Sequence, residues 1–230
     1  MKEHIYTIPV NEAFEVGKGC PICRLFDRYE ADAVDHILGD AMMQPGIRIV
    51  TNKTGFCSDH YTQMFSGKNR LGLALILQSH LDEVNGKLFK KSSPFSSAPD
   101  SNKTASYLNG LNGSCYVCDR VRGHMELVMT TVYHLWNSEN KFREIAGAQE
   151  FYCLHHYEAL AGGCAKNVSK NLQKSFMETL SKVQQSYADS LSEDIDWFCR
   201  KFDYRNKDEP WNNSKDAVER VIAFLEKPIK

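Results

Sequence analysis

Apolar residues recur three and four positions apart along much of the chain, which is the spacing of one face of an α-helix. In residues 21–39 this face consists of Ile22, Leu25, Phe26, Tyr29, Ala33 and Ile37. The same spacing predicts helices over residues 70–89, 116–136, 167–202 and 215–226, the last with Ser214 as N-cap and Pro228 after its end. Only residues 47–50 have the composition of a strand. We therefore expect an all-α protein built from helix hairpins.

A pattern of cysteine and histidine occurs twice in the chain. Each half contains C-x2-C and then, after 33 or 34 intervening residues, C-x2-H. The residues are Cys20, Cys23, Cys57 and His60 in the first half, and Cys115, Cys118, Cys153 and His156 in the second. Neighbouring positions match as well, because an aromatic residue precedes the third cysteine and a tyrosine follows the histidine in both halves. This repetition indicates an internal duplication.

The spacing of these residues is that of metal ligands. Two ligands three positions apart face one ion when the first precedes a helix and the second lies in its first turn, where the helix N-terminus also stabilises a thiolate. We expect each half to bring its own C-x2-C and C-x2-H together in one Cys3His site. Tetrahedral zinc binds such a set and is left with no open position, so we expect two structural zinc ions per chain. An iron–sulfur cluster is the alternative cofactor.

Other interpretations of the cysteines and histidines receive less support. A dithiol redox pair at Cys20 and Cys23 would require a βαβ pattern around it, and it would leave both C-x2-H pairs unexplained. Aligning the halves selects His156 over the adjacent His155. Cys164 and Cys199 have no partner at metal spacing, so we expect buried, inert thiols at both positions. The acidic residues in 27–35 are expected to form a solvated helix face.

Composition shifts along the chain predict its organisation. Residues 90–114 are rich in Ser, Asn and Gly, which is typical of a linker or a long surface loop. We expect a first helical metal-binding unit at residues 1–99, a second at 100–189, and a C-terminal helical clasp at 190–230. The clasp gathers the aromatic residues Trp197, Phe198, Phe202, Tyr204 and Trp211. These either pack the tail over the two units or form a surface for a partner or ligand.

Charge and the absence of known motifs exclude several function classes. The 28 basic and 29 acidic residues give a net charge of -1, which argues against nucleic-acid binding. No run of about 18 apolar residues is present, so no membrane span is expected. The N-terminus lacks the apolar region of a signal peptide, which predicts a cytoplasmic location. The motifs of P-loop enzymes, hydrolases, Rossmann enzymes and zinc proteases are absent, so a non-catalytic role is favoured.

Several motifs resemble those of one protein family. They are IPVNEAFE at residues 8–15, CPIC at 20–23, GFC-x2-H at 55–60, and the tail at 201–211. With them the chain resembles, over nearly its whole length, an uncharacterised bacterial family found mostly in Firmicutes, a domain of unknown function. Some members carry a label as substrate-binding proteins of ABC transporters, but this sequence has neither a lipobox nor an α/β pattern to support that label. The resemblance implies no catalytic residues.

These features together predict a metal-binding, cytoplasmic helical protein. It would act as an adaptor or regulatory module toward an unknown protein partner or small ligand. The competing function is that of an iron–sulfur protein, for electron transfer or for sensing of redox state or oxygen.

Overall fold

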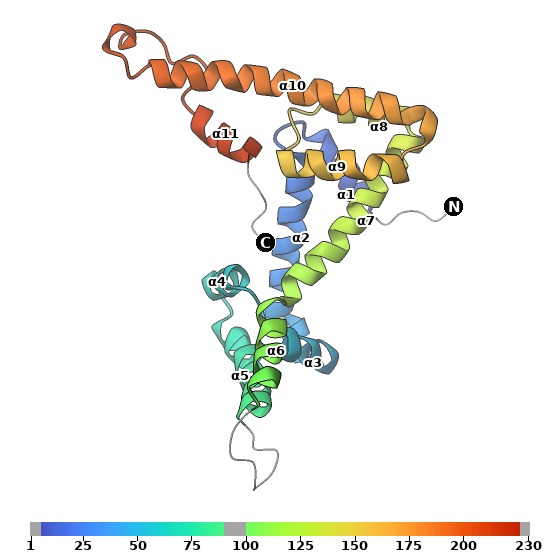
Figure 1. The fold of residues 1–230 in the computed structure, drawn as a ribbon, viewed down its shortest axis with the longest axis vertical. Helices are drawn as coiled ribbons and strands as arrows, with labels where there is room; N and C mark the ends of the chain where they lie inside the picture. The colour runs from blue at the N-terminus through green and yellow to red at the C-terminus, as the bar shows by residue number, and fades with distance from the viewer. Residues whose placement is uncertain (1–5, 90–99, 226–230) are drawn as a thin grey trace. The chain divides into compact units, whose positions relative to one another are not determined.

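The computed structural model describes residues 6–89 and 100–225, and within these ranges the protein contains α-helices and short 3-10 helices but no strand. The all-α prediction is thus confirmed. The elements are α1 (Thr7–Glu15), α2 (Pro21–Leu38), η1 (Asp40–Met43), α3 (Pro45–Thr54), α4 (Ser58–Ser66), α5 (Arg70–Leu88), α6 (Ser101–Asn112), α7 (Tyr116–Ser138), α8 (Asn140–Gly147), α9 (Leu154–Asn167), α10 (Lys170–Arg200), η2 (Tyr204–Asn206) and α11 (Ala217–Leu225) (Figure 1).

Contacts between Cα atoms divide the chain into two compact units. Unit 1 comprises Met1–Phe26 and Met125–Lys230, and unit 2 comprises Asp27–His124. The long helices α2 and α7 each contribute residues to both units. This division differs from the three consecutive segments expected from the sequence. That those segments fold as separate domains stays a prediction.

Aromatic side chains dominate the core of unit 1. Helices α8, α9 and α11 pack against α10, and α1 packs against α8. The ring of Trp136 meets that of Phe176 edge-on at 4.9 Å between centroids, and Phe14 lies at the same distance from Phe142. The tail joins this unit, because Phe224 of α11 packs against Phe151 and Tyr187 with centroids 6.0 and 5.6 Å apart.

Unit 2 has a smaller core of aliphatic side chains. Helix α5 packs against α3, α4 and η1, and α3 also contacts η1. Ile37 of α2, Met64 of α4 and Ile76 of α5 are fully buried. Helix α2 buries the apolar face that the sequence predicts, with Ile22, Leu25, Ala33 and Ile37 all inaccessible to solvent or nearly so.

Two segments fold differently from the expectation. Residues 47–50 lie in the helix α3 instead of a strand, because Pro45 sets the first helical turn and Gly55, with φ +59°, ends the helix by donating its N–H to Thr51 O. The expected loop at 90–114 is wrong for residues 101–112, which form α6. The carboxylate of Asp100 accepts the N–H groups of Asn102 and Lys103 and so caps that helix. Residues 90–99 of that expected loop lie outside the described residues.

The remaining helix predictions hold with shifted ends. The helix expected at 167–202 is α10, which begins at Lys170. The helix expected at 215–226 begins at Ala217, and the Ser214 hydroxyl donates to Trp211 O instead of capping a helical N–H. Glu226 and Pro228 lie outside the described residues.

Candidate metal centres

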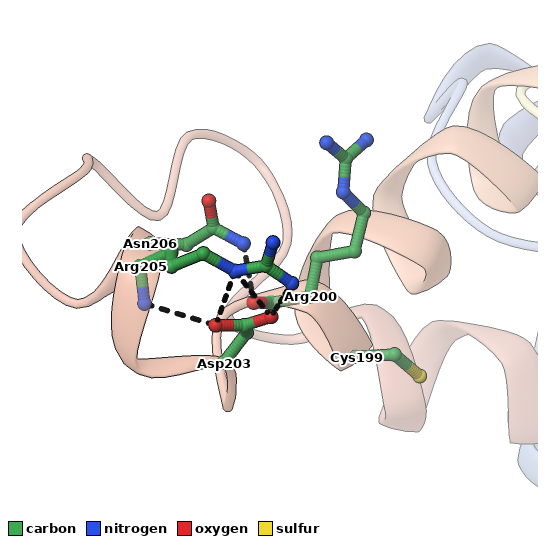
Figure 2. A pocket seen from close by; sticks show the side chains of 5 residues that line it. All are labelled: Cys199, Arg200, Asp203, Arg205 and Asn206. Atoms are coloured by element: carbon green, nitrogen blue, oxygen red, sulfur yellow. Dashed lines mark hydrogen bonds and ion pairs between the residues drawn. The ribbon is translucent and has the colours of Figure 1, made fainter.

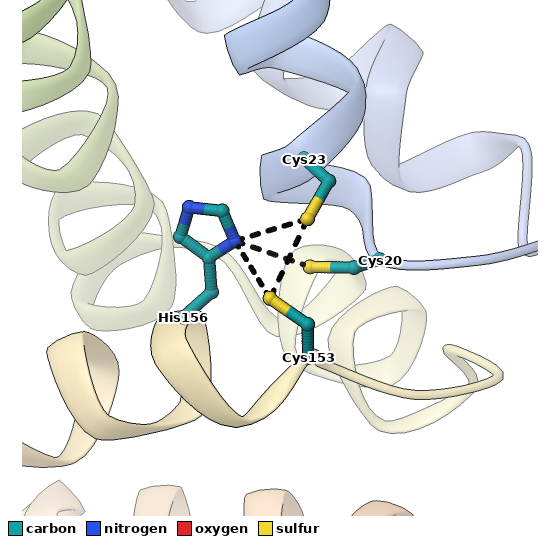
Figure 3. Close-up of side chains that lie close together, drawn as sticks. All are labelled: Cys20, Cys23, Cys153 and His156. Atoms are coloured by element: carbon teal, nitrogen blue, oxygen red, sulfur yellow. Dashed lines mark hydrogen bonds between the residues drawn. The ribbon is translucent and has the colours of Figure 1, made fainter. Parts of the chain in front are cut away.

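Four potential ligands from the starts of α2 and α9 meet in unit 1. The group, called cluster A, consists of Cys20, Cys23, Cys153 and His156, with all four ligand atoms within 4.8 Å of one another. Figure 3 shows the three sulfurs turned toward the His156 ring. The Nδ1 atom of His156 lies 3.6, 3.2 and 3.1 Å from the sulfurs of Cys20, Cys23 and Cys153, and the last two sulfurs are 3.4 Å apart.

Unit 2 contains a second group of the same composition at the starts of α4 and α7. Cluster B consists of Cys57, His60, Cys115 and Cys118, again with all ligand atoms within 4.8 Å. The Nδ1 atom of His60 lies 3.0, 3.2 and 3.5 Å from the sulfurs of Cys57, Cys115 and Cys118. The sulfurs of Cys57 and Cys118 are 3.9 Å apart. The structure therefore brings together all eight residues selected from the sequence.

The expected pairing of these residues within each half is wrong. Each C-x2-C meets the C-x2-H of the other half. The reason is the length of the helix that follows each C-x2-C. The 18 residues of α2 span about 27 Å, whereas the only α-helix between α2 and Cys57, a stretch that the structure describes in full, is α3, whose 10 residues span about 15 Å. The first C-x2-H thus lies beside Glu30, half way along α2, where it meets the second C-x2-C at the start of α7.

Helix N-termini surround both groups of sulfurs, as the spacing predicts. Cys57 and Cys153 occupy the N-cap positions of α4 and α9, while Cys20 and Cys115 directly precede α2 and α7. In cluster B the Cys118 N–H donates to Cys115 Sγ at 3.5 Å. The unpaired N–H groups at a helix start favour a thiolate over a neutral thiol, so this placement suits metal ligation.

Hydrogen bonds connect the two ligand-bearing loops of each cluster. In cluster A the Gly19 N–H donates to the Glu150 carboxylate at 2.6 Å. In cluster B the Tyr116 N–H donates to Gly55 O at 3.0 Å. A Cβ at Gly55 would stand 2.8 Å from the His80 ring in a left-handed conformation, so only glycine fits this loop. These bonds link the paired loops directly to each other.

The crowded thiols of cluster A are electrostatically unequal. Hydrogen bonds from Cys153 and Cys23 lower the pKa of Cys20 to about 3. Hydrogen bonds with Cys153 and then with Cys20 raise the pKa of Cys23 above its ordinary value. Three thiolates so close together would repel one another, and a cation at their centre would offset that repulsion.

Cluster B has the same imbalance. Burial opposes ionisation of Cys115, but its hydrogen bond with His60 lowers its pKa to about 6. Burial likewise opposes the charging of His60, yet the sulfurs of Cys115 and Cys57 raise its pKa to about 9. Burial and the Cys115 sulfur raise the pKa of Cys118. A protonated His60 thus offsets part of the negative charge of the cluster B thiolates, and a metal ion would offset more of it.

A carboxylate supports the histidine of cluster B and was missed from the sequence. The Nε2 atom of His60 lies 3.2 Å from Glu30 Oε1, and Gln63 donates to the other oxygen at 3.0 Å. Glu30 belongs to the acidic residues expected to be solvated, and no sequence spacing connects it to His60. This contact fixes Nε2 as the protonated nitrogen and leaves Nδ1 for a metal. Among the described residues, His156 has no such carboxylate on its Nε2.

Replacing Glu30 by glutamine should weaken metal binding at cluster B and leave cluster A unchanged. Loss of such a carboxylate typically lowers metal affinity about 10–100-fold, because the imidazole loses basicity and orientation. Competition with a chromophoric chelator measures both affinities. Asp35→Asn, on the solvent face of the same helix, is the matched control. An unchanged cluster B affinity in Glu30→Gln would contradict this role.

The other singled-out side chains lie outside the clusters. His155 is exposed, with its ring 5.1 Å from that of His156. Cys164 is buried as expected, and burial raises its pKa. The expectation of a buried Cys199 is wrong, because this residue lies exposed near the end of α10.

The segment after α10 forms an ordered loop with exposed aromatic side chains. The Lys201 ammonium group is buried and donates to three backbone carbonyls, those of Asn206, Lys207 and Glu209. An open hollow of about 540 Å³ lies here, lined by Cys199, Arg200, Asp203, Arg205 and Asn206, with Arg205 forked onto the Asp203 carboxylate (Figure 2). Beside it, Phe202 and Tyr204 are 76% and 85% exposed.

Comparisons with known proteins identify the family of the chain. The whole chain, residues 1–230, matches DUF6062, described as a family of unknown function. No curated protein and no solved structure matches the chain. In the part of the chain that the structure describes, no helix has the length and apolar character needed to cross a bilayer.

Proposed function

The chain belongs to DUF6062, a family of unknown function, and we propose that each of its two clusters binds one zinc ion. Each ion would hold the starts of helices together. The protein then serves as a metal-stabilised adaptor or regulatory module. The observation that carries this proposal is the convergence of three sulfurs and one imidazole nitrogen, twice, from residues distant in sequence.

The distances within the clusters support a single ion at each. A tetrahedral zinc with bonds of about 2.3 Å to sulfur separates its sulfur ligands by about 3.8 Å. The sulfurs of Cys23 and Cys153 in cluster A are 3.4 Å apart, and those of Cys57 and Cys118 in cluster B are 3.9 Å apart. An iron–sulfur cluster distributes its protein ligands over several iron atoms, so its cysteine sulfurs stand farther apart as a set.

The ligand number supports a structural role over a catalytic one. Four protein ligands complete the tetrahedron and leave no position for water or substrate. Three of the ligands in cluster A are buried, as are His60 and Cys115 in cluster B. The ions would therefore contribute to folding and leave the binding of partners to other surfaces.

The ordered loop after α10 supports the binding role. Its backbone is held by the buried Lys201 and by the indole N–H of Trp197, which donates to Pro210 O at 2.9 Å. Phe202 and Tyr204 thus stand exposed on a preorganised loop, and aromatic anchors that lose little entropy on binding are common at interfaces. We assign this loop as the surface through which the adaptor contacts a protein partner.

Elemental analysis of protein purified anaerobically without added metal tests the proposal, with an absorption spectrum of the same sample. The expected result is two zinc ions per chain and no visible absorbance. Iron with acid-labile sulfide would replace the proposal by electron transfer or sensing. Absence of both metals, with eight titratable thiols, would refute metal binding.

Metal binding should release protons at neutral pH. The pKa values of Cys23 and Cys118 lie above the ordinary thiol value in the metal-free protein, so both carry a proton that the ion must displace. Affinity should therefore rise with pH. Calorimetric titration with zinc in two buffers of different ionisation enthalpy should give at least one proton released per ion. Equal enthalpies in the two buffers would contradict this.

A further inference from the structure

Several large apolar side chains of unit 2 are exposed. Its described residues with large, exposed hydrophobic side chains are Met43, Ile49, Val50, Phe65, Leu71, Leu77, Leu81 and Phe89. Soluble monomers seldom leave apolar side chains in contiguous rows on one element, and such rows mark interaction sites. Three of these leucines lie on the single helix α5.

The exposed leucines of α5 form one stripe along the helix. Leu71, Leu77 and Leu81 are 71%, 38% and 58% exposed, and the exposed Ala74 lies between them at helical spacing. The opposite side of α5, with Leu73 and Ile76, is buried in unit 2. A helix that is apolar on both sides requires a partner on each of them.

The stripe is symmetric about residue 76 of the sequence. Leu71 and Leu81 stand five positions on either side of it, and Ala74 and Gln78 stand two positions on either side. The exposed Arg70 and Asp82 stand six positions on either side and carry opposite charges. Two-fold interfaces use one self-complementary patch on both subunits. Antiparallel pairing of two such helices places each Arg70 at the level of the other copy's Asp82.

We propose that the α5 stripe is the contact surface for a second copy of this chain, in an antiparallel helix pair. Leu71 of one copy then packs near Leu81 of the other, and Ala74 lets the two backbones approach closely. The stripe from residue 71 to 81 is about 15 Å long, which is shorter than a standard interface. The dimer is therefore expected to be weak and to form only at high protein concentration.

Sedimentation velocity of the full metal-loaded chain over a wide concentration range tests the proposal. The expected result is a shift from monomer to dimer mass as concentration rises, abolished by Leu77→Glu. Leu127→Glu, at an exposed leucine of α7 in unit 1, is the control and should dimerise like the parent. Circular dichroism and metal content verify that each variant is folded.

Charge exchange tests the antiparallel arrangement itself. Arg70→Asp and Asp82→Arg should each weaken the dimer by setting like charges at the same level, and the double variant should restore it. A monomer at every concentration would overturn the proposal and assign the stripe to another occupant. A dimer that responds to neither the leucine nor the charge variants would overturn it as well.

Discussion

Replacing Cys23 by serine will remove one of the two proposed zinc ions and leave the other in place. Cys23 is a member of cluster A alone, and a site reduced to two sulfurs and one imidazole loses most of its affinity. Structural zinc contributes on the order of 10 kcal/mol of apparent free energy in small peptides at neutral pH. The thermal stability should therefore fall markedly. Cys118→Ser should have the same effect through cluster B.

Pairs of substitutions distinguish the observed pairing from the one within halves. Cys23→Ser combined with Cys153→Ser should still leave one ion, because both residues belong to cluster A. Cys23→Ser combined with Cys57→Ser should leave none. Metal content of the folded variants gives the answer, with Cys199→Ser as the control that keeps both ions. The reverse result, one ion in the second pair and none in the first, would contradict the crossed arrangement.

Removal of both ions by a chelator should unfold unit 2 before unit 1. Of the twelve largest fully buried side chains in the described residues, nine lie in unit 1 and only Ile37, Met64 and Ile76 lie in unit 2. Burial of a large apolar side chain contributes about 1.5–3 kcal/mol, so unit 1 retains a core that does not depend on metal. We therefore expect unit 2, with the smaller core, to depend on cluster B more than unit 1 depends on cluster A.

Hydrogen exchange with and without chelator measures this difference. Amides of α4 and α5 should lose protection on metal removal, while those in the middle of α10 should keep it. Cys118→Ser in the presence of zinc should reproduce the loss in unit 2 alone. Equal loss of protection in both units would show that the aromatic core of unit 1 is insufficient without its ion.

The helices and the ligands were predictable from the sequence because they depend on local spacing. The apolar period of α2 and the C-x2-C and C-x2-H pairs at helix starts are properties of a few neighbouring residues. The pairing of the ligands was not predictable in this way. It depends on the 18-residue length of α2, which separates a C-x2-C from the C-x2-H that follows it in sequence.

The remaining differences have similar physical causes. Residues 47–50, three of them β-branched and apolar, fit a strand or a helix equally well, and Pro45 and Gly55 favour the helix α3. Helix α6 has no fully buried residue, and its half-buried face is limited to Thr104, Tyr107, Leu108 and Leu111, so its apolar period is weak among the Ser, Asn and Gly that predict a loop. Glu30 contacts His60 from 30 positions away, and such a contact exists only in the folded chain.

X-ray absorption at the zinc edge tests the central claim most directly, because it reports the atoms bound to the metal. The account predicts, for protein with two ions, an average of three sulfurs at about 2.3 Å and one nitrogen at about 2.0–2.1 Å, with no metal neighbour. A second metal atom near the first, or oxygen in place of sulfur or nitrogen, would contradict two closed Cys3His sites.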